Sequence, residues 1–139
     1  MIKSLSSIVA EVEGKQTPEE QAEVLRKYDS PSLRSLLEYA LHKHVNWLMP
    51  VDSIPPYRPL HEASDQEGRL YQELRKFDYF INTQQGLNLN QVRREQLFIQ
   101  VLESIDPNDA LMVLRVKDKK IKIDKKAVII AFGDFAKGW

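Results

Sequence analysis

The stretch QVRREQLFIQVLESIDPNDALMVLRVKDKKIKIDKKAVIIAF, residues 91–132, decides the predicted fold. Asn90 can cap a helix that begins at Gln91, and apolar side chains between residues 97 and 105 cover more than half of that helix's surface. A helix that is apolar over so much of its circumference normally lies at the centre of a fold. We therefore predict that the other helices pack around the segment Leu97–Ile105.

A second helix is predicted directly after the first. Asp106 can accept amide hydrogen bonds at a helix start, and Pro107 suits the first helical position. Asp124 can cap a third, short helix in the same way. The face of the second helix that we predict to be buried consists of Ala110, Leu111, Val113 and Leu114.

Positive charge is concentrated between the second and third of these helices. Residues 115–126, here called the basic segment, contain seven basic and two acidic side chains, a local net charge of +5 in a chain whose total is zero. Ile121 and Ile123 alternate with lysines, which predicts an extended turn with two apolar side chains pointing inward. The lysines of that turn are then expected to point into solvent.

The basic segment has two interpretations: a solvated edge of the protein, or a surface that binds phosphate groups. The concentrated charge, the two isoleucines and the amide groups at the predicted helix starts favour phosphate binding. No segment resembles a helix that reads bases, so we expect binding to duplex DNA to be independent of base sequence. About five phosphate contacts predict a slope near −4.5 for log affinity against log salt. The candidate residues are Arg93, Arg94, Lys117, Lys119, Lys120, Lys122, Lys125 and Lys126.

The rest of the chain predicts further helices. Apolar spacing indicates a helix over residues 2–14, Thr17-Pro18 and Ser30-Pro31 each begin another, and residues 65–81 form a fourth. Residues 82–88 are predicted to be a loop. These features predict a single all-α domain of six or seven helices over residues 1–139. Its amino-terminal part is acidic because it contains Glu11, Glu13, Glu19, Glu20 and Glu23.

Residues 47–60 hold four prolines, which exclude both a helix and a central strand. Because the segment is also rich in apolar residues, we predict an extended strap packed across the helices. The alternative is a polyproline ligand for a partner protein, with Pro55, Pro56 and Tyr57 as contacts. Trp139 either anchors a partner as well or folds back onto the core.

Several functional classes are excluded or disfavoured by composition and motifs. The chain has no cysteine, so disulfides and thiolate metal sites are excluded. The first residues lack the features of a signal peptide, and no apolar run reaches membrane-spanning length, so we expect a cytoplasmic protein. His42, His44 and His61 lack a carboxylate cluster that would complete a metal site. Without a phosphate loop, a nucleophile elbow or a buried acid–base pair, we predict no enzyme activity, cofactor or small-molecule substrate.

Two resemblances follow from particular residues. The opening Met1-Ile2-Lys3-Ser4-Leu5 and the closing residues 109–132, with Lys120-Ile121-Lys122-Ile123-Asp124 at the turn, resemble the amino-terminal DNA-binding domain of phage ATP-dependent DNA ligases. Asp124 stands where those ligases have a glycine that lets the backbone approach the minor groove. The lysine motif of nucleotidyl transfer, Lys-x-Asp-Gly, is absent, so the resemblance implies DNA contact without ligation.

The chain also resembles small uncharacterised proteins of tailed phages that infect cyanobacteria. The shared features are Leu-Met-Pro with the following Pro-Pro-Tyr, the helix with Arg93-Arg94-Glu95, and the run from Asp109 to Lys120. This second resemblance implies a phage protein in the host cytoplasm and brings no activity with it.

The sequence thus predicts a non-catalytic accessory protein that binds duplex DNA, or docks on a phage replication or repair complex, through the basic segment. The alternative is a protein-interaction module, such as a phage adaptor or an inhibitor of a host enzyme, that does not contact nucleic acid.

Overall fold

The computed structural model describes residues 3–60 and 68–139 of the chain. Three sequence predictions fall outside these residues: the place of Ile2 in the first apolar stripe, the position of His61, and the helix start near Asp65.

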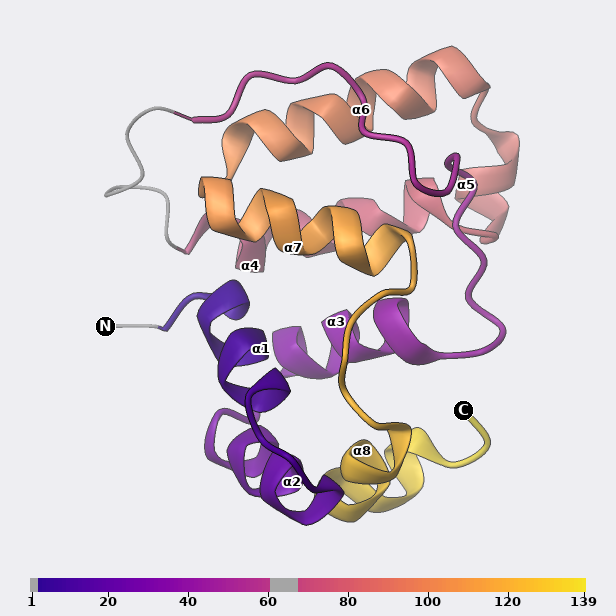
Figure 1. Ribbon diagram of the computed structural model, residues 1–139. Helices are drawn as coiled ribbons and strands as arrows, with labels where there is room; N and C mark the ends of the chain where they lie inside the picture. The colour runs from indigo at the N-terminus through magenta and orange to yellow at the C-terminus, as the bar shows by residue number, and fades with distance from the viewer. Residues whose placement is uncertain (1–2, 61–67) are drawn as a thin grey trace.

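The described residues form an all-α domain, as the sequence predicts (Figure 1). Eight α-helices and two 3-10 helices are found there, against the six or seven helices predicted. In chain order they are α1 (Leu5–Glu13), α2 (Pro18–Lys27), α3 (Pro31–Leu41), α4 (Arg69–Glu73), η1 (Leu74–Phe80), α5 (Gln84–Asn88), α6 (Gln91–Ser104), α7 (Pro107–Lys117), α8 (Lys125–Phe132) and η2 (Gly133–Ala136).

The helix starts confirm the capping predictions. At each predicted cap the side-chain oxygen accepts a hydrogen bond from an amide in the first turn, and three of these helices begin with proline. The amide donors are thereby satisfied locally, so each start is defined by a few neighbouring residues. The five caps are Thr17, Ser30, Asn90, Asp106 and Asp124.

The centre of the fold is α7 and not α6, which corrects the sequence prediction. In Figure 1, α7 lies between α6 above and α1 and α3 below, and it packs against all three. Ala110, Val113 and Val116 of α7 are fully buried. Leu111, predicted to be buried, is exposed. Asp109 and Lys117 are also buried on α7, so apolar residues alone do not mark its buried face.

The predicted helix over residues 65–81 is replaced by α4 and the 3-10 helix η1. A 3-10 helix has three residues per turn, so Leu74, Phe77 and Phe80 lie on one face, and all three are buried. The change of helix type therefore follows the spacing of these apolar residues.

The predicted loop over residues 82–88 contains the short helix α5. Thr83 caps it by accepting a hydrogen bond from the amide of Gly86. A side chain at Gly86 would meet the carbonyl oxygen of Ile81 at 2.0 Å. Glycine is required here because the backbone of residue 81 approaches so closely.

The strap predicted over residues 47–60 is present and crosses the surface of α6 (Figure 1). At its start, the amide of Leu48 donates to the carbonyl of Phe80 at 2.8 Å, and the Trp47 indole donates to the carbonyl of Tyr39. Further along, the amide of Arg58 donates to the carboxylate of Glu103 at 2.8 Å. The prolines of the strap therefore belong to a pinned segment of the fold.

Helix α2, near the start of the chain, packs along α8, near its end (Figure 1). The acidic helices α1 and α2 are thus neighbours of the basic segment, although the two are separated in sequence. No helix in the described parts of the chain is both long and apolar enough to cross a membrane.

Candidate functional site

The turn of the basic segment is anchored by its two isoleucines, as predicted. Ile121 is 8% exposed and Ile123 is 5% exposed, whereas Lys122 between them is exposed. Alternation along an extended backbone points these neighbours to opposite sides. The turn is therefore part of the packed structure, and its middle lysine projects into solvent.

Residues from the amino-terminal helices hold the backbone of this turn. Gln21 of α2 donates its side-chain amide to the carbonyl of Lys122 at 3.3 Å and accepts from the amide of Asp124 at 3.0 Å. Glu13 of α1 accepts from the amide of Lys122 at 2.7 Å. Sequence reasoning missed both residues. The one available signal was a polar glutamine at a buried helical position.

Glu13 also forms a two-pronged ion pair with Arg115, with N–O distances of 2.8 and 2.9 Å. Burial by itself raises the pKa of Glu13, but the hydrogen bonds from Arg115 and the Lys122 amide outweigh burial and hold its pKa below the ordinary value. The carboxylate is therefore charged and fully engaged within the protein.

Two candidate phosphate-binding residues are internal, which corrects the prediction for them. Lys117 is 2% exposed, and its ammonium donates to the carbonyl of Pro50 and to the carboxylate of Asp118, each at 2.6 Å. Arg94 is buried, and its guanidinium donates to the carbonyls of Gly86 and Leu89 at 2.7 Å. Both side chains are therefore engaged by backbone carbonyls within the protein and do not point freely into solvent.

A third candidate, Lys120, is exposed but paired within the chain. Its ammonium contacts the carboxylate of Asp52 in the strap, and this hydrogen bond raises the pKa of Lys120. Arg93 is exposed in the first turn of α6, which begins beside α5, whereas the basic segment descends toward α8 (Figure 1). Arg93 stands on α6, which packs against α7, and it is not one of the lysines of the turn and of α8 considered below.

Lys119 lies at the position where α7 ends. Its φ of 58° is left-handed, and the amides of Lys119 and Lys120 donate to the carbonyls of Val116 and Arg115. This arrangement is a Schellman motif, in which the left-handed position is usually glycine. The motif turns the chain sharply out of α7 and into the extended turn.

The ammonium groups of Lys119 and Lys125 are brought together by the fold. Lys119 donates to the carbonyl of His42 at 2.9 Å, and Lys125 donates to the backbone oxygen of Trp139 at 3.0 Å. Burial of the ammonium, and then repulsion from Lys125, lower the pKa of Lys119 to about 8. Two like charges held next to one another attract an anion.

Four exposed lysines remain as candidates after these corrections, and two of them, Lys119 and Lys125, also donate to backbone oxygens. Among residues 3–60 and 68–139, no carboxylate lies within ion-pair distance of their ammonium groups. We call this set the basic face: Lys119, Lys122, Lys125 and Lys126.

Trp139 is buried, so the interpretation in which it folds back onto the core is confirmed. Its ring lies 5.1 Å from that of Phe135 and 5.6 Å from that of His42, measured between centroids. It is not an exposed anchor for a partner. Within the described residues, no three histidine, aspartate or glutamate side chains are grouped as a metal site would need.

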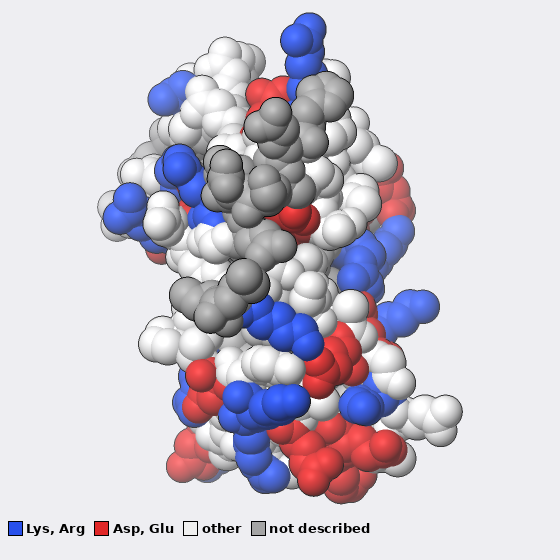
Figure 2. Space-filling model, turned by 90° about the vertical axis from the view of Figure 1, so that its left-hand side faces the viewer, with Lys and Arg blue, Asp and Glu red and all other residues white. Residues whose placement is uncertain are grey.

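Acidic and basic side chains are mixed on the neighbouring face formed by α1 and α2. Figure 2 shows red side chains gathered in the lower half of that face, with blue ones among them. Exposed carboxylates there include Glu19, Glu20 and Glu23 of α2. The basic face is therefore bordered by negative charge, which limits how far its field extends.

The fold and site define a small all-α protein whose candidate site is a rigid, lysine-bearing turn braced by its amino-terminal helices. The chain belongs to the DUF6433 family, a family of unknown function, whose model matches residues 8–123. No curated protein matches the chain. No solved structure matches it either.

Proposed function

We propose that this protein docks on the phosphate backbone of duplex DNA through the basic face. The observation that carries the proposal is the anchoring of the turn: Ile121 and Ile123 are buried on either side of the exposed Lys122. Cations on a fixed backbone lose less conformational freedom on binding than cations on a loose tail. The turn therefore holds its lysines in fixed positions, which favours binding to the regularly spaced phosphates of a duplex.

The proposed contact is non-catalytic and independent of base sequence. The four lysines of the basic face can each meet a phosphate oxygen, but none stands on a long exposed helix that could enter the major groove. Phosphate contacts alone fix the position of a protein on a duplex without reading its bases. An accessory role on a DNA-bound complex fits this kind of binding.

The resemblance to the DNA-binding domain of phage DNA ligases supports the same surface, because its turn corresponds to residues 120–124. The resemblance to small proteins of cyanobacterial phages suggests a phage replication or repair complex as the setting. Asp124 has an extended backbone with a φ of −71°, so its position does not need glycine. Its carboxylate, however, caps α8 beside the basic face and repels a phosphate there.

The test is the salt dependence of binding to a short duplex of random sequence, measured by fluorescence anisotropy. Four phosphate contacts predict a slope of about −3.6 for log affinity against log salt. The double variant Lys122→Glu with Lys126→Glu should make this slope shallower by about 1.8, because two contacts are lost.

A matched control carries the same change of charge elsewhere. Arg75 on η1 and Arg93 on α6 are both exposed, and η1 packs with α3, α4, α5 and α6. The variant Arg75→Glu with Arg93→Glu should leave the slope unchanged. Equal losses in both double variants, or no binding by the parent protein at low salt, would refute the proposal.

A further inference from the structure

A pocket lies between the strap and α6, and it is a feature of the fold separate from the basic face. The strap is held on one side by Lys117, which donates to the carbonyl of Pro50, and on the other by Glu103, which accepts from the amide of Arg58. Asp118 also accepts from the amide of Asp52 at 3.2 Å. Between these attachments the strap arches over α6 and leaves a hollow beneath it.

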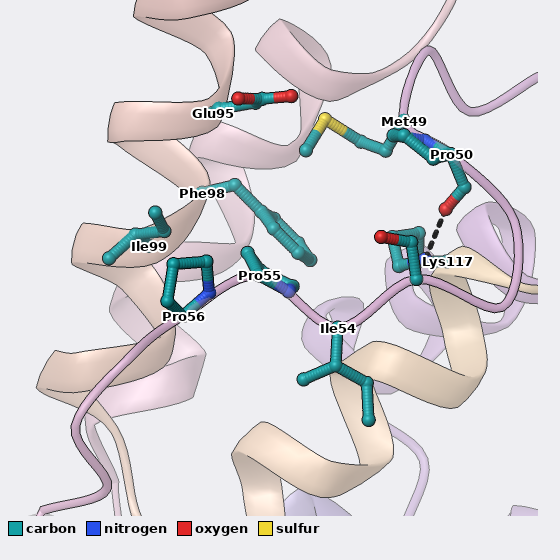
Figure 3. Close-up of a pocket in the computed structure, with 10 residues that line it drawn as sticks. Met49, Pro50, Ile54, Pro55, Pro56, Glu95, Phe98, Ile99 and Lys117 are labelled. Atoms are coloured by element: carbon teal, nitrogen blue, oxygen red, sulfur yellow. Dashed lines mark hydrogen bonds between the residues drawn. The ribbon is translucent and has the colours of Figure 1, made fainter.

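The pocket has a volume of about 270 Å³ and mostly apolar walls (Figure 3). Phe98 and Pro55 face each other at its centre, with Ile99 and Pro56 on one side and Met49 on the other. Pockets for drug-sized ligands have volumes of about 300–1,000 Å³. This pocket is slightly smaller, so its size suits a single aromatic side chain.

The negative charge of Glu95 at the pocket favours a ligand in which a basic residue is adjacent to the aromatic one. Glu95 lines the pocket, and its carboxylate accepts from the side-chain amide of Gln91 at 3.0 Å. Among residues 3–60 and 68–139 no Lys or Arg pairs with Glu95. The ammonium of Lys117, in contrast, is engaged by Pro50 and Asp118.

Exposed aliphatic side chains extend the apolar surface beyond the pocket. Ile54 of the strap is 70% exposed. Val92 of α6 is 67% exposed and lies on the same helical face as Glu95 and Ile99, since the spacings are three and four residues. A buried aromatic anchor surrounded by such contacts is the usual form of an energetically important interface centre.

We infer that the pocket binds an aromatic side chain of a partner protein, with an adjacent lysine or arginine pairing with Glu95. The strap then acts as one wall of a receptor for the partner's side chain. In the polyproline interpretation, the strap was itself the ligand. This inference does not depend on DNA docking, and it makes the protein an adaptor if both sites are used.

The test uses three blocked hexapeptides whose central residues are tryptophan–lysine, tryptophan–glutamate and alanine–lysine. Binding is followed by the NMR amide shifts of the ¹⁵N-labelled protein. We expect saturable shifts at Ser53, Glu95 and Ile99 with the first peptide. The second should bind about threefold to fivefold more weakly, in line with an exposed ion pair, and the third should give no saturable shift.

The variant Glu95→Gln should remove the difference between the two tryptophan peptides, while Glu38→Gln on α3, an exposed carboxylate elsewhere, should preserve it. Unchanged thermal midpoints check that both variants fold. The inference is overturned if the alanine peptide binds as well as the first, if the shifts fall outside the pocket, or if Glu95→Gln keeps the preference for lysine. Absence of saturable shifts with any peptide also overturns it.

Discussion

The carboxylate of Glu13, at the end of α1, accepts a hydrogen bond of 2.7 Å from the backbone amide of Lys122, which lies 109 residues further along the chain. The same carboxylate pairs with Arg115, which stands just before the turn. One acidic side chain therefore connects α1 both to the last turn of α7, through Arg115, and to the extended turn that follows, through Lys122. The position of the candidate site depends on this connection and on the bonds from Gln21.

Removal of the Glu13 carboxylate should destabilise the protein. Glu13→Ala leaves the Lys122 amide and the Arg115 guanidinium without their acceptor, and we expect a loss of about 1–3 kcal/mol in urea unfolding. Glu11→Ala removes a half-buried carboxylate of the same helix that pairs with the exposed side chain of Lys3, and it should cost less stability than Glu13→Ala. Because the pKa of Glu13 is lowered in the folded state, its contribution is complete above about pH 4.5 and is lost as the pH falls through the lowered value. An acid limb of the stability curve that stays unchanged in Glu13→Gln would contradict this assignment.

DNA affinity should decrease as the pH rises through 8, because Lys119 then loses its proton in the free protein. A phosphate binds the charged form, so above pH 8 binding requires proton uptake. Between pH 7 and pH 9 at constant salt, we expect a decrease of up to about tenfold. Lys119→Arg keeps its charge over this range and should flatten the dependence. An equal decrease in the arginine variant would mean that Lys119 is not the group responsible.

Asp124→Asn should strengthen DNA binding without loss of stability. Asparagine caps a helix about as well as aspartate, so the hydrogen bond from the Lys126 amide can be retained. The substitution removes a negative charge from the middle of the basic face, and we expect affinity to rise about twofold to fivefold. Affinity and thermal midpoint are measured on the same sample. Weaker binding with an unchanged midpoint would mean that phosphates do not approach this turn.

The same substitution to methionine should lower stability at Lys117 but weaken DNA binding at Lys122. Lys117→Met removes the donor to Pro50 and the partner of Asp118, and we expect a loss of about 1–3 kcal/mol in stability. Lys122→Met, at an exposed position, should leave stability nearly unchanged and weaken DNA binding. Chemical denaturation with a parallel binding assay separates these outcomes. If Lys117→Met unfolded like the parent protein, the strap would not depend on this contact.

Local patterns predicted much of the fold. Proline after a capping side chain marked the starts of α2, α3 and α7, because both effects act within one helical turn. Alternation of isoleucine and lysine predicted the anchored turn for the same reason. The 3-10 helix η1 and the short helix α5 were missed, since each depends on packing and on a backbone contact that spacing alone does not reveal.

The sequence by itself determined the all-α class, the helix caps, the strap and the two buried isoleucines, because these follow from neighbouring residues. Only the tertiary structure decided which cations are available. It buried Lys117 and Arg94 against carbonyls from other segments, paired Lys120 with Asp52, and placed Lys119 beside Lys125. It also placed acidic α2 along α8. The acidic and basic parts of the chain are therefore far apart in the sequence but adjacent in the folded protein. The physical reason is that the electrostatic partners of a side chain are set by distance in space, and these partners come from segments far apart in the chain.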